Sequence, residues 1–216
     1  MQLELHTAPM SPFARPVELA LEMKGLAFTR HTPALEDIRH ADFRALNPLG
    51  RIPVLVVDGV AFPEAQLICE FIEEAFPAQP LLPGDPVGRF RARLLARLAD
   101  TYISGPAVQL VQNTSGEAGA ALAAQAIDQI ERGIAGLERW LAGPLYAAGE
   151  ARSLADCFLP PALFSLGKAL PALGISNVPA LGLKAAAYLE NIRQDEIVGA
   201  CLASLEAGLA ERVARA

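Results

Sequence analysis

The segment Asn47-Pro48-Leu49-Gly50-Arg51-Ile52-Pro53-Val54-Leu55 decides how the first part of this chain folds. Pro48 and Gly50 favour a turn, and an apolar strand follows from Ile52. A proline near the start of such a strand removes a backbone donor from the sheet. One interpretation is a bend, with a cis Ile52–Pro53 bond, that turns the N–H and C=O of Ile52 outward to pair with an extended peptide ligand. The alternative is an edge-strand proline without a functional role.

The composition is that of a globular protein. The chain has 216 residues, of which 52% are hydrophobic and 19% charged, so it is long and apolar enough to bury a sizeable core. Its net charge of −6 argues against nucleic acid as the main partner, because phosphate binding needs a basic surface. No run of about 18 apolar residues lacks charges, so we expect no membrane partner.

The three cysteines predict neither a metal site nor a disulfide framework. Cys69, Cys157 and Cys201 are far apart in the sequence and lie in apolar helical patterns, which is typical of buried free thiols. The segment Met1–Leu5 lacks the basic and long apolar regions of a signal peptide. We therefore expect a cytoplasmic, reduced protein.

The first part of the chain alternates strand and helix patterns in the order β-α-β-α-β-β-α. A helix that follows a strand returns the chain for parallel pairing, and Asp58-Gly59 favours a tight hairpin. Pro16 is tolerated only in the first turn of a helix, so the first helix is expected to begin a residue or two after Ser11. The predicted elements are strands over 3–7, 28–32, 54–57 and 60–62 and helices from shortly after 11 to about 24, over 36–46 and over 65–76.

A proline-rich segment then separates two predicted domains. Residues 77–86 hold four prolines and a glycine, which is typical of a linker. The sequence therefore predicts an α/β domain over 1–76 and an all-helical domain over 87–216. Ser153 and Asp156 have the spacing of a capping box at the start of a helix, which favours a role for Asp156 in folding rather than in catalysis.

Four stretches together resemble the cytosolic glutathione transferases of the serine type. They are residues 11–17 (Ser-Pro-Phe-Ala-Arg-Pro-Val), residues 47–55, Glu64 with the helix after it, and residues 153–156. The resemblance spans most of the chain. It implies a thioredoxin-like first domain, a helical second domain, and an enzyme with glutathione as co-substrate and no metal.

The resemblance gives Ser11 the catalytic role. A thiol is a weak nucleophile until it is deprotonated, and a hydroxyl near a helix N-terminus can stabilise the thiolate. In serine-type members the residue at this position acts in that way. The alternative is that Ser11 simply caps the helix, and Thr7 is a second, weaker candidate for the hydroxyl.

The resemblance also assigns glutathione-binding residues. The backbone at Ile52-Pro53 would pair with the cysteinyl part, Arg51 would meet the glycyl carboxylate or else be a solvated surface charge, and Glu64 would hold the γ-glutamyl ammonium. Ala65 departs from the family, which usually has Ser or Thr here to bind the γ-glutamyl carboxylate. This loss motivates the alternative of a weakly active or non-catalytic binding protein on the same fold.

The helical domain is expected to supply the electrophile site and the contacts of a homodimer. Met10, Phe13, Tyr102 and Val108 are candidate walls for a small hydrophobic electrophile, although the helical pattern alone does not separate such walls from core residues. Near the position where family dimers pack, the first long helix carries four arginines, namely Arg89, Arg91, Arg93 and Arg97.

Overall fold

The protein divides into two compact units, Met1–Leu81 and Leu82–Ala216, in a computed structural model that describes residues 1–34, 36–112 and 116–215. The division falls inside the proline-rich segment 77–86. Within the described ranges, no helix has both the length and the apolar character that crossing a membrane requires.

The first unit is a mixed four-stranded sheet with helices on both faces, which confirms the predicted thioredoxin-like α/β arrangement. The strands lie in the order β2-β1-β3-β4, with β2 parallel to β1 and β3 antiparallel to both of its neighbours. The elements are β1 (Leu3–His6), α1 (Arg15–Met23), β2 (Thr29–His31), the short 3₁₀ helix η1 (Asp37–Arg39), α2 (Ala41–Leu46), β3 (Val54–Val57), β4 (Val60–Pro63) and α3 (Ala65–Ala75).

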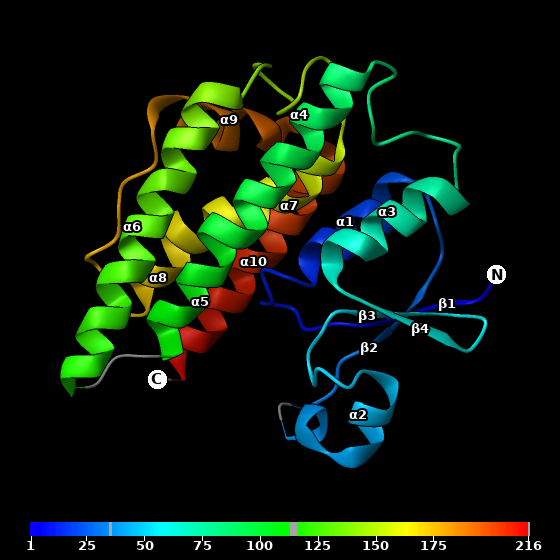
Figure 1. The fold of residues 1–216 in the computed structure, drawn as a ribbon, viewed down its shortest axis with the longest axis horizontal. Helices are drawn as coiled ribbons and strands as arrows, with labels where there is room; N and C mark the ends of the chain where they lie inside the picture. The colour runs from blue at the N-terminus through cyan, green and yellow to red at the C-terminus, as the bar shows by residue number, and fades with distance from the viewer. Residues whose placement is uncertain (35, 113–115, 216) are drawn as a thin grey trace. The chain divides into compact units, whose positions relative to one another are not determined.

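The central strand β3 has core on both of its sides. Val54 and Val56 pack with Ile38 and Phe43 in a small cluster under α2. The alternating residues of β3 are also buried, and α1 packs beside α3 on the opposite face of the sheet (Figure 1). A strand that is buried on both faces explains why this segment is continuously apolar rather than alternating.

The first helix begins later than the sequence suggested. Residues 12–14 form turns, and α1 starts only at Arg15, so the expectation of a start one or two residues after Ser11 was wrong. Pro16 does lie in the first turn, where its missing N–H costs nothing. Gly25 follows the C-terminus with a φ of +66°, the left-handed conformation that glycine adopts readily.

A buried ion pair ties the end of α1 to the end of α3. The ammonium of Lys24 lies 2.6 Å from the carboxylate of Glu73 and also donates to the carbonyls of Phe76 and Gln79. Glu73 in turn accepts from the N–H of Leu81. These contacts hold the residues that leave α3 against the first unit.

Within its described residues, the second unit has helices as its regular elements, as expected, besides one isolated bridge between Tyr146 and Gly149. Its helix α7 is buried along its whole length and forms the centre of the unit. The elements are α4 (Pro86–Arg97), η2 (Leu98–Ser104), α5 (Gly105–Gln112), α6 (Gly116–Trp140), α7 (Leu154–Phe164), η3 (Ser165–Ala169), α8 (Leu170–Ala172), α9 (Leu183–Asn191), η4 (Ile192–Gln194) and α10 (Glu196–Ala214).

Two long helical runs of the second unit contain π-helical segments. The segments η2 and η3 are π-helical. A proline stands two residues after the end of each segment, Pro106 after η2 and Pro171 after η3. A proline has no N–H to donate to the carbonyl four residues earlier, so the regular ladder is broken there. The apolar pattern of the sequence does not reveal such segments, because it reports which face of a helix is apolar and not the local hydrogen bonding.

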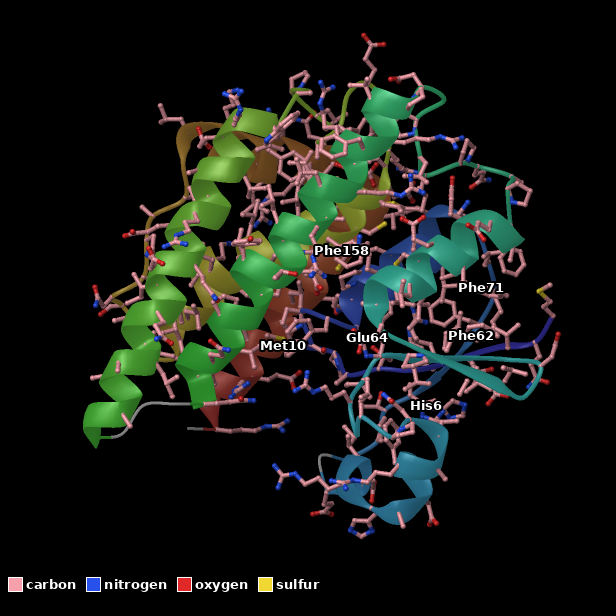
Figure 2. All side chains as sticks on the ribbon, in the orientation of Figure 1. His6, Met10, Phe62, Glu64, Phe71 and Phe158 are labelled. Carbon is pink, nitrogen blue, oxygen red and sulfur yellow. The ribbon has the colours of Figure 1, made fainter. Side chains whose placement is uncertain are left out.

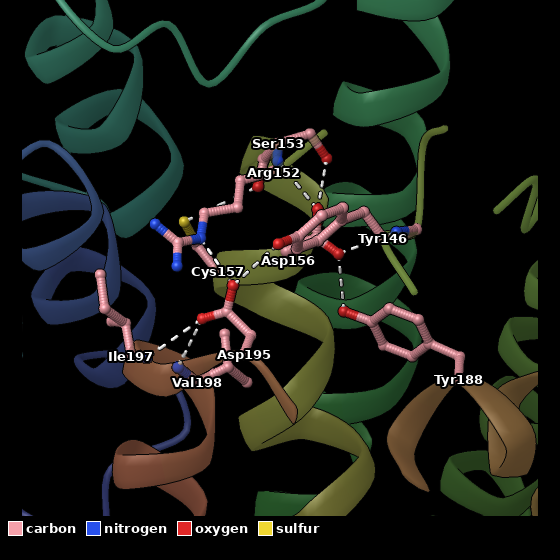
Figure 3. A network of polar contacts seen from close by, with 10 residues as sticks. Tyr146, Arg152, Ser153, Asp156, Cys157, Tyr188, Asp195, Ile197 and Val198 are labelled. Carbon is pink, nitrogen blue, oxygen red and sulfur yellow. Dashed lines mark hydrogen bonds and ion pairs between the residues drawn. The ribbon is translucent and has the colours of Figure 1, made fainter. Parts of the chain in front are cut away.

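The capping box predicted at the start of α7 is confirmed and forms part of a buried network (Figure 3). Asp156 accepts from the N–H and the hydroxyl of Ser153, at 2.8 Å each. It also accepts from the N–H of Ala147 at 2.8 Å and from the hydroxyl of Tyr188 at 2.9 Å. Burial raises the pKa of Asp156 to about 6, and these donors act in the opposite direction.

A second carboxylate, Asp195, caps α10 in the same region (Figure 3). It accepts from the N–H groups of Ile197 and Val198, at 3.1 Å each. Its other oxygen binds the guanidinium of Arg152 at 2.6 Å and the hydroxyl of Tyr146 at 3.1 Å. The two carboxylates therefore join the start of α7 to α9 and α10.

We expect Tyr188→Phe to lower the free energy of unfolding by about 1–3 kcal/mol, because a buried carboxylate loses a donor. The pKa of Asp156 in the folded protein lies above the usual 3.8 of an aspartate, so the stability that this group contributes is present below pH 3.8 and is lost as pH rises through about 6. Asp156 is ionised above this range and needs its donors most there. Urea titrations should therefore show that the substitution lowers the free energy of unfolding more above about pH 6 than below it.

Tyr146→Phe is the matched control. Asp195 keeps Arg152 and two backbone donors in this variant, so its loss should be the smaller one. Equal losses in the two variants at every pH would contradict the role given to Tyr188.

Candidate functional site

Three loops leave the sheet of the first unit at the same edge. His6, the last residue of β1, is paired with Val54, the first residue of β3. Val54 is paired in turn with Pro63, the last residue of β4. The loop after β1, the bend before β3 and the start of α3 therefore emerge together, and they carry the predicted site residues Ser11, Ile52-Pro53 and Glu64-Ala65.

Ser11 lies half-buried in the loop between β1 and α1. Its Oγ accepts from the N–H of Ala14 at 3.2 Å, and its carbonyl accepts from the N–H of Arg15 at 3.2 Å. The capping role is therefore real, although it acts on the turn before α1. Among the described residues, none accepts the hydrogen of the Ser11 hydroxyl. The hydroxyl can therefore accept from the N–H of Ala14 and still donate to a ligand.

Thr7 is not free to play the same part. Its side chain is buried, and its hydroxyl donates to the carboxylate of Glu18 at 2.5 Å. Its N–H donates to the carbonyl of His31. Of the two candidate hydroxyls, only that of Ser11 retains its hydrogen for a ligand.

The Ile52–Pro53 bond is cis, as the first interpretation of the sequence proposed. Pro53 is buried, and the sheet pairing begins at Val54, so the backbone of Ile52 lies outside the ladder. Arg51 is exposed. The backbone groups of Ile52 are thus placed at the edge where a peptide could add alongside the sheet.

Sequence reasoning missed the residue that shapes this bend. Asn47 is buried, and its side-chain N–H donates to the carbonyl of Arg51 at 2.8 Å while its Oδ1 accepts from the N–H of Leu49 at 3.1 Å. Its carbonyl accepts from Gly50, which has a φ of +60°. The Asn-Pro-x-Gly pattern carried the signal, since asparagine commonly bonds the backbone of its own turn.

Glu64 and Ala65 lie where β4 turns into α3. Glu64 is exposed and has a φ of +72°, a left-handed conformation that costs a non-glycine residue about 1–3 kcal/mol. Strain of this kind is found where a backbone position serves a site. Ala65 is the first residue of α3, where N–H groups have no partner within the helix. Its side chain adds only a methyl group.

Aromatic contacts fix the elements around this edge. Phe62 of β4 stacks on Phe71 of α3, with ring centroids 4.5 Å apart, on either side of the turn that holds Glu64 (Figure 2). At the end of β1, His6 stacks on His31 at 5.0 Å and meets the edge of Phe43. Burial, and then the neighbouring imidazole of His31, lower the pKa of His6. No pattern in the sequence pointed to this histidine pair.

The four candidate electrophile residues lie in both units. Met10 and Phe13 are half-buried in the loop between β1 and α1 of the first unit. In the second unit, Tyr102 belongs to η2 and is 37% exposed, while Val108 is half-buried in α5. Their grouping into one site stays a prediction.

Comparisons with known proteins identify relatives of this chain. Residues 5–80 match the family described as "Glutathione S-transferase, N-terminal domain". The chain is 33% identical over 170 residues to glutathione S-transferase U6 of Arabidopsis thaliana, across 78% of this chain and 74% of the relative. It is 30% identical over 159 residues to a probable maleylacetoacetate isomerase of Caenorhabditis elegans, across 70% and 73%.

A solved structure gives the same result for the fold. A glutathione S-transferase from Methylobacterium radiotolerans, in complex with glutathione sulfonate, superposes with a TM-score of 0.77 at 28% sequence identity. The match covers 94% of this chain and 95% of that structure. The similarity therefore extends over both units and is not confined to the sheet domain.

Proposed function

The chain belongs to the glutathione S-transferase family, and from that premise we propose that it joins the glutathione thiolate to a small hydrophobic electrophile, with Ser11 stabilising the thiolate. The observation that carries the proposal is the Ser11 hydroxyl, which keeps its hydrogen at the sheet edge where Ile52 and Glu64 also emerge.

The proposed chemistry is thiolate activation. An unperturbed thiol with a pKa of about 8.5 is mostly protonated near neutral pH. A hydroxyl that donates to the sulfur stabilises the charged form and lowers the pKa of the thiol. Ser11 is suited to this donation because its Oγ accepts from the N–H of Ala14, which leaves its own hydrogen available for the sulfur.

The remaining site residues would hold glutathione by its backbone and its charged ends. We assign the cysteinyl backbone to Ile52 and the bend at Pro53, the glycyl carboxylate to Arg51 and the γ-glutamyl ammonium to Glu64. We assign the γ-glutamyl carboxylate to the N–H groups at the start of α3, beginning with that of Ala65, because a helix N-terminus attracts anions.

We assign the electrophile to apolar side chains, with Met10 and Phe13 as the candidates in the first unit and Tyr102 and Val108 as the candidates in the second. Partly buried apolar surface of this kind suits a small hydrophobic molecule better than a charged one. A glutathione-dependent isomerisation is a second candidate, because one of the relatives bears the name of a probable maleylacetoacetate isomerase. Turnover of that relative's substrate without net loss of glutathione would distinguish the two reactions.

A binding protein with little or no activity is the alternative motivated by Ala65. The lost hydroxyl removes a charge-assisted hydrogen bond of about 1.5–3 kcal/mol, which is a tenfold or larger loss of affinity. The helix N–H groups remain, however, so the site keeps a means of holding the carboxylate.

We further propose that the protein is a homodimer that buries part of α4. On this helix Val87 and Phe90 are 63% and 55% exposed, large fractions for apolar side chains. The ring of Phe90 meets Trp140 of α6 edge-on at 5.8 Å and is thereby held at the surface. Apolar groups presented in this way are typical of interfaces.

Ser11→Ala tests the catalytic role. Loss of the hydroxyl donor to a charged sulfur should lower the rate of conjugation to a chloronitrobenzene by about tenfold to a hundredfold. The pKa of the bound thiol, followed by the ultraviolet absorbance of the thiolate, should rise in parallel. Ser11→Thr keeps a hydroxyl and should retain part of the activity. Unchanged conjugation in Ser11→Ala would show that another group activates the thiol.

Ala65→Ser tests the carboxylate contact. Restoring the hydroxyl should tighten glutathione binding by about tenfold in titration calorimetry. Ala75→Ser, at the other end of the same helix, is the control and should leave the affinity unchanged. The enzyme hypothesis expects saturable binding to the unmodified protein at millimolar concentrations or below; no binding in either protein would favour the alternative.

Phe90→Asp tests the dimer. A charge in the centre of an apolar interface should shift the sedimentation of the protein from dimer to monomer. Leu183→Asp introduces the same charge at a side chain that is 89% exposed in α9, and the dimer should persist. A monomeric unmodified protein, or dissociation in both variants, would contradict this assignment.

A further inference from the structure

The carboxylate of Glu18 is the most enclosed charged group near the loop that carries Ser11. Glu18 lies in the first turns of α1 and is only 3% exposed. A buried carboxylate is costly unless hydrogen bonds and opposite charges satisfy it. Sequence reasoning gave this residue no role, because a glutamate in an amphipathic helix is usually a solvated surface group.

The partners of Glu18 lie at the two ends of one loop. Its Oε1 accepts from the hydroxyl of Thr7 at 2.5 Å, directly after β1. Its Oε2 accepts from the guanidinium of Arg15 at 2.7 Å, the first residue of α1. A single carboxylate therefore fastens residue 7 to residue 15, and Ser11 lies midway between them. Arg30 of β2 adds a longer ion pair at 3.7 Å.

The hydrogen bonds of Ser11 are made with residues at the end of the loop where α1 begins. Its carbonyl accepts from the N–H of Arg15, and its Oγ accepts from the N–H of Ala14. If Arg15 or Thr7 shifted, the turn at 12–14 would shift with it, and the direction of the Ser11 hydroxyl would change. Catalytic groups need positions that are held to within about half an ångström by their surroundings.

We propose that Glu18 is a positioning residue that fixes the direction of the Ser11 hydroxyl by holding both ends of its loop. The inference rests on the proposed role of Ser11 as thiolate stabiliser. Glu18 itself touches Thr7 and Arg15 and acts on the sulfur only through the loop. Its contribution should therefore appear in the activation of the thiol, and much less in the binding of glutathione at Ile52 and Ala65.

Thr7→Val is the decisive variant, because it removes one fastening and leaves the buried Glu18–Arg15 ion pair intact. We expect kcat to fall by about tenfold and the pKa of the bound glutathione thiol to rise by about one unit, with KM for glutathione little changed. Hydrogen exchange at the N–H of Ala14, measured without glutathione, should become faster.

Glu18→Gln and Glu22→Gln form a matched pair on the same helix. Glu18→Gln should show the same three changes, to a greater extent. Glu22 lies one turn further along the helix, and its ion pair is with Arg30 at 2.5 Å rather than with a residue of the loop. Its substitution should leave the thiol pKa, kcat and the exchange of Ala14 as they are.

The outcomes separate this inference from the function on which it rests. A folded Thr7→Val protein with unchanged thiol pKa and unchanged exchange at Ala14 would overturn the positioning role, even if Glu18→Gln fails to fold. An unmodified protein that does not bind glutathione would overturn the proposed function instead. The exchange of Ala14 would then still decide whether Glu18 holds the loop.

Discussion

The antiparallel pairing of β3 with both β1 and β4 is the constraint on which the first unit depends. It places His6, Val54 and Pro63 side by side, so that three loops open at one edge of the sheet. A slip of one residue would turn Val54 and Val56 away from the cluster under α2 and would also misplace the loops. The same hydrophobic register that closes the core therefore also assembles the candidate site.

Buried charged groups then hold the segments at both ends of α1, whose positions the strand pairing does not determine. At the start of α1, Glu18 fastens Thr7 and Arg15; at the end of the same helix, Lys24 binds Glu73 and the carbonyls beyond α3. Pairs of this kind contribute little net stability compared with apolar packing, but they permit few alternative arrangements. One helix thus orients the loop of the candidate site at its beginning and holds the residues that follow α3 at its end.

The order of elements was predictable because it follows from local rules. Asp58-Gly59 specified the hairpin, and Ser153 with Asp156 the start of α7. Details that depend on distant residues were not. The late start of α1 reflects a turn capped by Ser11, and the contact of Lys24 with Glu73 joins residues far apart in the chain. Neither leaves a periodic signal in the sequence.

The candidate site combines two kinds of contact that differ in how they tolerate substitution. At Ile52 and at the start of α3 the proposed binding groups are backbone atoms, which the fold supplies whatever the side chain is. Ala65 can therefore lack a hydroxyl without abolishing the proposed anion site. The proposed activation of the thiol, in contrast, depends on one side-chain hydrogen at Ser11. Binding should thus follow from the fold, whereas activity should follow from how firmly that one loop is held.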